Sequence, residues 1–227
     1  ENNVKLSVIS HYRLDKSIQF VKKQIDQGFF GNLNLGNVSI KWNRSSSYYE
    51  SSEKWRKKKS ISGGGVLMIQ AIHYIDLLLW LFGEVESVYG KIDTKVHDIE
   101  GEDVALAVLK FKSGAIATVQ GTTAVVKTLP DILEIHGDKG SVVFKRNKLI
   151  NKITFLRTDT DFLGKIKNKI NTYLKIRKGA IKDQIENFVD SIQNNKKPLV
   201  TGEDGLRALE VVLGIYKSSN LNKEIKL

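Results

Sequence analysis

The sequence predicts an α+β fold, in which an open, mainly antiparallel sheet carries its helices on one face. Strand-like segments joined by short turns run consecutively through residues 84–144, and consecutive strands with short connections pair side by side. Segments with helical spacing lie before and after this run. With 227 residues and 41% hydrophobic content, the chain can bury a sizeable core.

The first three elements are expected to be a strand, a helix and a strand. Residues 4–10 alternate apolar and polar side chains, which is typical of a strand. Residues 15–27 carry apolar side chains at helical spacing, with Asp15 in the capping position and Gly28 at the end. Residues 33–42 predict a second strand, and a polar, aromatic segment follows it.

A buried helix is expected over residues 65–82, because this stretch is nearly all apolar and has helical spacing. Gln70, His73 and Asp76 recur in it at intervals of three, so they project from one stripe. Such buried polar groups must be hydrogen-bonded, solvated in a cleft or used in chemistry. The serine and three glycines before the helix allow two interpretations: free amides that bind an anion, or an ordinary serine cap.

The middle of the chain predicts a run of strands. They are expected at 84–93, 102–111, 114–121, 131–137 and 141–144, with tight turns at 112–114 and 137–140. Residues 104–109 are continuously apolar, which indicates a strand buried on both faces. Because helices cover one face of the sheet, the other face needs a partner. We therefore expect a homo-oligomer, a dimer or tetramer, that packs sheet against sheet.

The last part of the chain is predicted to hold one further strand at 153–157 and two helices, 181–193 and 203–218. The first of these helices has its apolar side chains on one face. The basic run 164–178 is either an amphipathic helix or a mobile arm.

Composition narrows the class of protein. The formal net charge of +11, concentrated at 56–59 and between 145 and 182, favours an anionic partner, with a lysine-rich solvated surface as the alternative. The absence of cysteine excludes disulfides and thiolate chemistry and fits a reducing compartment, so we expect a cytoplasmic protein. No apolar run reaches the roughly 20 residues of a membrane span, and no two histidines have metal-ligand spacing.

The chemistry that remains centres on His73 and on an aromatic segment. The sequence has no Gly-x-Gly-x-x-Gly fingerprint, phosphate loop or nucleophile elbow. His73 can take or give a proton, with Asp76 orienting it, or it is a satisfied core residue. The segment 42–56 gathers aromatic rings and arginines that suit sugars, bases and phosphates: Arg44, Tyr48, Tyr49, Trp55 and Arg56.

A family resemblance rests on residues 63–78, Gly-Gly-Gly-Val-Leu-Met-Ile-Gln-Ala-Ile-His-Tyr-Ile-Asp-Leu-Leu. They resemble the Gly-Gly-Gly and His-x-x-Asp signature of the glucose-fructose oxidoreductase and inositol dehydrogenase (Gfo/Idh/MocA) family. The likeness extends over nearly the whole chain, through Val-Ile-Ser-His-Tyr-Arg at 8–13, Gly-Asp-Lys-Gly-Ser-Val at 137–142, Asp-Gln-Ile-Glu-Asn-Phe at 183–188 and Gly-Glu-Asp-Gly at 202–205.

The resemblance implies an enzyme of two domains. In this family an N-terminal Rossmann domain binds NAD or NADP, and a C-terminal open sheet, like that of dihydrodipicolinate reductase and glyceraldehyde-3-phosphate dehydrogenase, carries the substrate wall and the subunit contacts. The chain resembles the second half only. Residues 1–10 would be the last strand of a missing dinucleotide domain, which would supply the cofactor-binding residues, and residues 11–227 the substrate-binding and oligomerisation domain. Alone, the chain is expected to be inactive.

Within the family, the segment 41–49 is similar to that of UDP-N-acetylglucosaminuronate 3-dehydrogenases of lipopolysaccharide O-antigen synthesis. By this likeness His73 would be the catalytic residue beside the oxidised hydroxyl. The residues implied to bind the nucleotide sugar are Arg13, Arg44, Tyr48, Tyr49, Gln70 and Asp76. The sequence departs from the family where 57–62 replaces the usual Gly-Thr-Trp-x-x-Asp approach to the glycines, and at Ile181.

Two alternatives remain beside a nucleotide-sugar dehydrogenase. The first is an inositol or simple hexose dehydrogenase of the same family. The second is a basic, non-catalytic module that holds nucleic acid or membrane, in which His73 is a core residue. Too few aromatic residues interleave the basic run for a typical binder of single-stranded nucleic acid. We therefore expect neither nucleic acid nor membrane as a partner.

Overall fold

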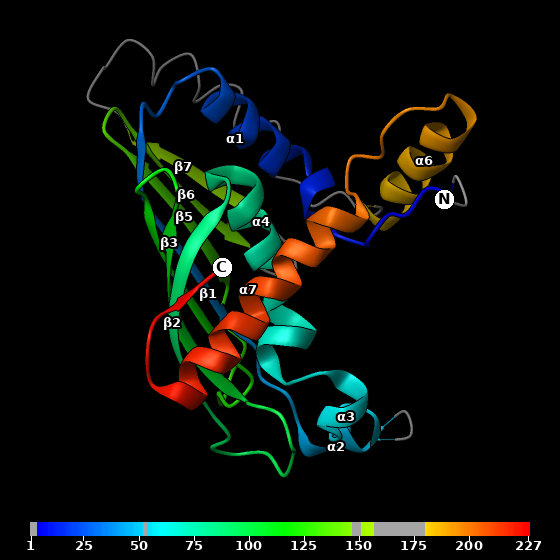
Figure 1. Cartoon of the computed structure of the whole chain (residues 1–227), viewed down its shortest axis with the longest axis vertical. Coiled ribbons are helices and arrows are strands. Elements are labelled where there is room, and N and C mark those ends of the chain that lie inside the picture. Colours follow the sequence, from blue (N-terminus) through cyan, green and yellow to red (C-terminus); the bar gives the residue numbers. More distant parts are fainter. Residues whose placement is uncertain (1–3, 52–53, 147–150, 157–179) are drawn as a thin grey trace.

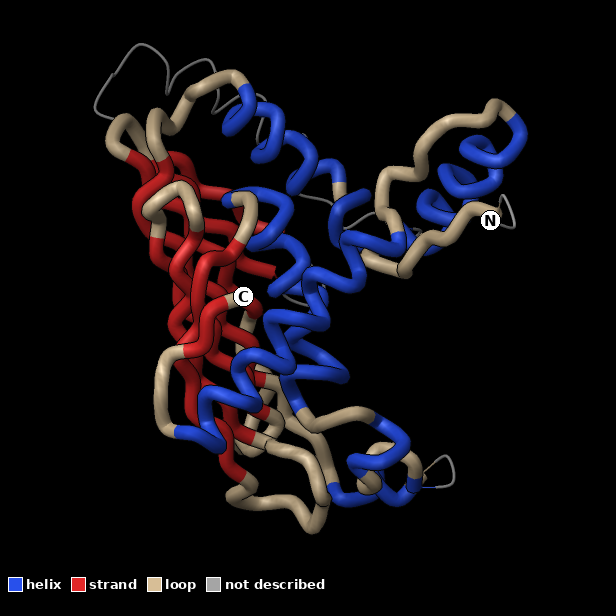
Figure 2. The backbone as a smooth tube through the Cα atoms, in the orientation of Figure 1, coloured by secondary structure: helices blue, strands red, loops and turns tan. Residues whose placement is uncertain are grey.

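The computed structural model describes residues 4–51, 54–146, 151–156 and 180–227, so the basic run 164–178 lies outside the described residues. One sheet contains eight strands in the order β7-β6-β5-β1-β4-β3-β2-β8, and Figure 2 shows it on one side of the molecule with the helices on the other. Every pair is antiparallel except β1 with β4. The strands are β1 Leu33–Lys41, β2 Val85–Asp93, β3 Val104–Phe111, β4 Ile116–Thr122, β5 Asp131–Gly137, β6 Ser141–Arg146, β7 Asn151–Leu156 and β8 Ile225–Lys226. The predicted fold class is confirmed.

The helices lie mainly over one face of this sheet (Figure 1). In chain order they are the 3-10 helix η1 His11–Leu14, α1 Lys16–Asp26, α2 Ser46–Glu50, α3 Lys59–Ser62, the π-helix η3 Leu67–Ala71, α4 Ile72–Phe82, α6 Ala180–Gln193 and α7 Gly202–Leu221. The predicted single helix over 65–82 therefore begins as a π-helix. The helical stretch Lys59–Phe82 is long and apolar enough to span a membrane, but 67% of its apolar 18-residue window is buried, as in the core helix of a folded domain.

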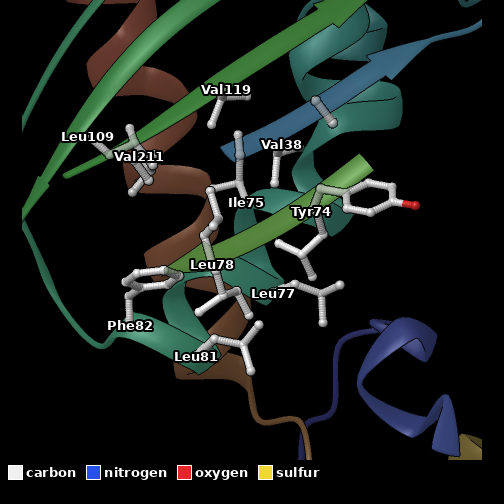
Figure 3. Close-up of a cluster of buried hydrophobic side chains, with 14 of the residues drawn as sticks. Val38, Tyr74, Ile75, Leu77, Leu78, Leu81, Phe82, Leu109, Val119 and Val211 are labelled. Carbon is white, nitrogen blue, oxygen red and sulfur yellow. The ribbon is translucent and has the colours of Figure 1, made fainter. Parts of the chain in front are cut away.

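Helix α4 forms the centre of the core. Figure 3 shows Ile75 and Leu78 facing the sheet, where they are fully buried against residues of three neighbouring strands. Val38 of β1, Val119 of β4 and Leu109 of β3 belong to the same cluster. Burying each such side chain stabilises the fold by about 1.5–3 kcal/mol. The residues at the start of α4 are thereby fixed relative to β1 and β3.

The opposite face of the sheet is open in the described chain. On β3, Ala105, Ala107 and Leu109 are buried, whereas Leu106 is 52% and Val108 is 42% exposed. The helices of the described chain cover one face of this strand, so the predicted burial of its other face, which requires a partner sheet, stays a prediction. An exposed apolar face of this kind suits a partner sheet. The expected homo-oligomer stays a prediction.

The first described residues form no strand. Residues 4–10 run along α6, and their polar groups bond to it and to the loop after it: the Gln184 amide donates to the Val8 carbonyl at 2.7 Å and accepts from the Ser10 amide at 3.0 Å. The predicted strand at 4–10 does not form in the described chain, which offers it no partner strand, and the Gln184 side chain bonds to the backbone of Val8 and Ser10. The assignment of residues 1–10 to a dinucleotide domain stays a prediction.

Helix α6 lies at the edge of the molecule together with this segment (Figure 1). Its buried side carries the polar residues Gln184 and Ser191, and its apolar side chains are exposed: Ile181, Ile185, Val189 and Ile192. The helix was predicted correctly, but most of its apolar side chains stay about half exposed in the described chain.

Candidate active site

A buried carboxylate holds the start of the central helix. Glu102, 4% exposed, accepts hydrogen bonds from the backbone amides of Gly65 and Leu67, both at 2.8 Å, and from the Tyr216 hydroxyl at 3.0 Å. A Cβ on Gly65 would lie 1.8 Å from the Glu102 carbonyl oxygen, and one on Gly64 would lie 1.9 Å from the Tyr216 hydroxyl. The glycines are therefore required by close packing.

This geometry decides between the two interpretations of the glycine run. The Ser62 hydroxyl donates to the carbonyls of Lys58 and Gly64, at 3.1 and 2.8 Å, and makes no cap. The amides of Gly65 and Leu67 are occupied by the chain's own carboxylate, so these two cannot receive an external anion. Neither interpretation is correct for these groups, because the partner comes from Glu102, which is 37 and 35 positions away in sequence.

The π-helix η3 carries the first of the predicted polar residues. π-helical turns are rare and concentrate at functional sites. Gln70 lies within η3 and is buried, and its side-chain amide donates to the Tyr48 hydroxyl at 3.2 Å. The structure therefore links the central helix to the aromatic segment after β1, which sequence reasoning had treated separately.

His73 follows at the start of α4 with its ring half-buried. Its ring centre lies 5.6 Å from that of His11 and 5.8 Å from that of Tyr12, both on η1. Burial lowers the pKa of His73, and the Asp76 charge opposes this effect. Burial, together with the His73 and Arg146 charges, also lowers the pKa of His11 to about 4. Among the described residues no hydrogen bond occupies the His73 ring, so a neutral imidazole is available to accept a proton.

Asp76 pairs with Arg13 instead of orienting the histidine. The two form a bidentate ion pair, with Arg13 Nη2 at 2.5 Å from Oδ1 and Nε at 2.9 Å from Oδ2 of Asp76. The Ser10 hydroxyl also donates to this carboxylate. Arg13 is 2% and Asp76 is 4% exposed, so the pair fixes η1 against α4. The predicted hydrogen bond that would orient His73 is absent from the described chain. A role of this pair in substrate binding stays a prediction.

The segment after β1 is partly helical, which corrects the prediction of an irregular loop. Tyr48 lies in α2, and the Arg44 guanidinium carbon stands 4.8 Å from its ring centre and 5.1 Å from that of Trp42. Tyr49 is buried behind it, with its hydroxyl 2.8 Å from the Thr123 hydroxyl. Arg44 and Tyr48 thus form one surface, which the buried Gln70 contacts through the Tyr48 hydroxyl. Substrate contacts by these residues stay predictions.

A second aromatic group borders His73 on the other side. The Tyr12 ring centre lies 5.0 Å from that of Tyr74, and the Arg146 guanidinium carbon is 4.2 Å from the Tyr12 ring centre. The Tyr74 hydroxyl donates to Asp131 at 2.8 Å, and burial raises the pKa of both groups. Sequence reasoning missed these residues, which come from four separate segments and form no local pattern.

Sequence reasoning gave no role to Glu102. It placed Arg56 in the contact segment 42–56 but not among the residues implied to bind the nucleotide sugar. The Arg56 guanidinium carbon lies 4.6 Å from the Tyr48 ring centre. The sequence signal for this contact was the clustering of Arg56 with Trp55, Tyr48 and Arg44 in one short segment. In the described ranges, no three His, Cys, Asp or Glu residues lie together so that they could hold a metal ion.

Comparison with known proteins shows the family to which this fold belongs. The family model for the C-terminal alpha/beta domain of the Gfo/Idh/MocA oxidoreductases matches residues 22–227. Myo-inositol 2-dehydrogenase of Thermotoga maritima is 26% identical over 169 residues, which are 72% of this chain and 49% of that protein. The chain therefore spans about half the length of this curated relative.

Two crystal structures are similar over almost the whole chain, and both are of WlbA dehydrogenases in complex with NADH and UDP-GlcNAcA. The Bordetella pertussis protein is 30% identical with a TM-score of 0.82, covering 99% of this chain and 63% of that one. The Chromobacterium violaceum protein is 26% identical with a TM-score of 0.84, covering 98% and 63%. The chain belongs to the Gfo/Idh/MocA oxidoreductase family, of which it carries the C-terminal α/β domain.

Proposed function

We propose that this chain is the substrate-binding and oligomerisation half of an NAD(P)-dependent, cytoplasmic dehydrogenase that oxidises the 3-hydroxyl of a UDP-N-acetyl-hexosaminuronate in lipopolysaccharide synthesis. The observation that carries the proposal is a half-buried His73 with no hydrogen bond to its ring among the described residues, on the helix that Gln70 links to the Arg44–Tyr48 surface. The similarity to two dehydrogenases solved with NADH and UDP-GlcNAcA supports the substrate class.

The chemistry requires a base for the hydroxyl proton. Oxidising an alcohol moves a hydride from carbon and a proton from oxygen, and a neutral imidazole can take the proton. Burial lowers the pKa of His73 and so favours the neutral ring that can accept this proton. The Arg13–Asp76 pair holds η1 beside the ring and contributes to the position of His73 through packing.

NAD(P), when bound, supplies the nicotinamide that accepts the hydride. The chain has no Gly-x-Gly-x-x-Gly fingerprint, so we assign the dinucleotide site to another part of the enzyme. The exposed apolar side chains of α6 support this assignment, since such a stripe suits a packed partner surface.

A second candidate within the family is an inositol or simple hexose dehydrogenase, which the similarity to myo-inositol 2-dehydrogenase supports. A neutral polyol does not require a cation. The guanidinium of Arg44 on the Tyr48 ring, in a chain of net charge +11, favours the anionic nucleotide sugar. Membership of the oxidoreductase family leaves a purely basic binding module without support.

The test separates binding from turnover. UDP-N-acetylglucosaminuronate is titrated calorimetrically into this chain, and NADH formation is followed in the complete polypeptide that carries it. Arg44→Ala should weaken binding, whereas His73→Asn should spare binding and lower turnover by about a thousandfold. His136→Asn, on β5 beside Ser141, is the matched control and should change neither. No binding at millimolar ligand, or full turnover in His73→Asn, would contradict the proposal.

A further inference from the structure

Two arginines share one tyrosine ring at the edge of the candidate site. The guanidinium carbons of Arg44 and Arg56 lie 4.8 and 4.6 Å from the ring centre of Tyr48. Arg44 also lies 5.1 Å from the ring centre of Trp42, and Arg56 lies 4.5 Å from that of Trp55. Both cations are therefore within 5 Å of one ring centre, and each is held by a second aromatic ring.

Among the described residues, the nearby carboxylate of Glu50 is paired with two lysines and leaves these arginines without an anion. The Glu50 carboxylate forms ion pairs with Lys54 Nζ at 3.3 Å and with Lys57 Nζ at 2.6 Å. In the described part of the chain, neither Arg44 nor Arg56 has a carboxylate within ion-pair distance. Two guanidinium groups around one ring repel each other, so the arrangement favours an external anion that neutralises both.

Both guanidinium groups also keep most of their hydrogen-bond donors unused in the described chain. The Nε atoms of Arg44 and Arg56 are buried and have no hydrogen-bond partner. Their other contacts are long: Arg44 Nη1 donates to the Asn43 carbonyl at 3.3 Å, and Arg56 Nη1 donates to the Ser51 hydroxyl at 3.4 Å. Buried donors are nearly always satisfied, so each unsatisfied group calls for an explanation, and an absent ligand is one.

We propose that Arg44 and Arg56 form a two-guanidinium clamp for a diphosphate, with Tyr48 as the platform between them. This inference rests on the proposed function and assigns to Arg56 a role in that substrate's binding. A diphosphate presents two adjacent anionic groups, and each planar guanidinium can bind one of them through two parallel hydrogen bonds. A neutral sugar or cyclitol offers no such group, so the clamp also determines specificity.

The clamp is connected to the proposed reacting group. The Tyr48 hydroxyl accepts from the Gln70 amide at 3.2 Å, and Gln70 precedes His73 by three residues on the central helix. The platform of the clamp is therefore joined by one hydrogen bond to the helix that carries the proton acceptor. The clamp supplies binding and orientation and makes no contact with the reacting bond.

The test uses uridine diphosphate, inorganic pyrophosphate and uridine, each titrated calorimetrically into the 227-residue chain at low salt. Arg56→Gln and Arg44→Gln should each weaken uridine diphosphate binding by about tenfold or more. Arg56→Lys keeps the charge without the planar fork and should fall between Arg56→Gln and wild type. Lys54→Gln, an exposed cation of the same segment already paired with Glu50, is the matched control and should change affinity less than about twofold. Pyrophosphate should follow the same order, and uridine should be insensitive to all four changes.

The outcomes distinguish the clamp from the proposed function. Unchanged affinity for uridine diphosphate in a folded Arg56→Gln, or no binding of it to the wild-type chain at millimolar concentration, overturns the clamp. If Arg56→Gln does not fold, unchanged affinity in Arg56→Lys overturns it equally. Full kcat/KM for UDP-N-acetylglucosaminuronate in Arg56→Gln would reject the clamp and keep the function. Arg56-dependent diphosphate binding without turnover of that sugar would keep the clamp and reject the function.

Discussion

Replacing Glu102 should destabilise the start of the central helix by an amount that depends on how much of its carboxylate is removed. Glu102→Ala leaves the amides of Gly65 and Leu67 and the Tyr216 hydroxyl without their acceptor. Each buried donor left unpaired costs about 1–3 kcal/mol, and water entering the space left by the side chain offsets part of this, so we expect a loss of about 3–5 kcal/mol. Glu102→Gln keeps the oxygen shared by Leu67 and Tyr216 and sets an amide against Gly65, so it should cost about 1–3 kcal/mol.

The assay is urea unfolding of the three proteins followed by circular dichroism. Glu100→Gln is the matched control, because this exposed carboxylate accepts one hydrogen bond, from the Lys59 amide at 2.8 Å. It should lie within about 0.5 kcal/mol of wild type. We expect stability to fall from wild type to Glu102→Gln to Glu102→Ala, because these changes remove successively more of the three hydrogen bonds that Glu102 accepts. Equal midpoints for Glu102→Ala and Glu100→Gln would refute the reasoning.

Three further predictions concern stability and use the same unfolding assay. Gly65→Ala should lower the free energy of unfolding by about 3 kcal/mol or more, because its Cβ would lie 1.8 Å from a backbone oxygen. Gly121→Ala is the control: its Cβ would meet the nearest atom at 3.4 Å, so it should stay within about 1 kcal/mol of wild type. Equal effects of the two changes would contradict the packing argument. Asp76→Asn leaves the buried guanidinium of Arg13 with one described carboxylate partner, Asp204 at 3.4 Å, and should lower the free energy of unfolding by about 3 kcal/mol. An unchanged free energy of unfolding would show that the ion pair is not structural. Because the folded pKa of His11 is lowered from 6.5 to about 4, the unfolded chain binds more protons in that range, and stability should fall as pH drops from about 6.5 to 4. Solvent screening of this half-exposed ring limits the loss to about 1–2 kcal/mol, and a His11→Gln chain with an equally steep fall would contradict the assignment.

Local sequence signals predicted most of the elements correctly. Asp15 accepts from the Ser17 amide at 2.9 Å and caps α1, as its position before the helix implied. The turn at 112–114 joins β3 to β4 through Gly114 at φ +90°, and Gly137 donates to the Gly140 carbonyl at 2.8 Å in the turn between β5 and β6. These features depend on residues only a few positions apart, so they can be predicted directly from the sequence.

The errors arose where a distant partner decides the outcome. Residues 4–10 alternate like a strand, but no neighbouring strand exists for them in the described chain, and Gln184 of α6 takes their bonds. Apolar spacing identified α6 as a helix, yet its buried side is the polar one because the N-terminal segment packs there. A periodic pattern defines a face, and the partner that covers it is a property of the tertiary structure.

Part of the candidate site was predicted from local sequence, and the contacts between distant segments were not. His73, Gln70 and Asp76 were identified from their spacing, because polar residues on a buried helix are conspicuous. Their partners were not, since the ion pair of Asp76 with Arg13 and the contact of Gln70 with Tyr48 join segments 63 and 22 positions apart. Pairing across such separations leaves no mark in local composition.

The central claim is that the enzyme to which this chain belongs acts on an anionic nucleotide sugar. The most direct measurement is NADH formation by the complete polypeptide with NAD⁺, comparing kcat/KM for UDP-N-acetylglucosaminuronate with that for myo-inositol. The account predicts a preference of about a thousandfold or more for the nucleotide sugar, the size expected when a site built to bind charged groups meets a substrate that lacks them. Equal or greater kcat/KM for myo-inositol would contradict it.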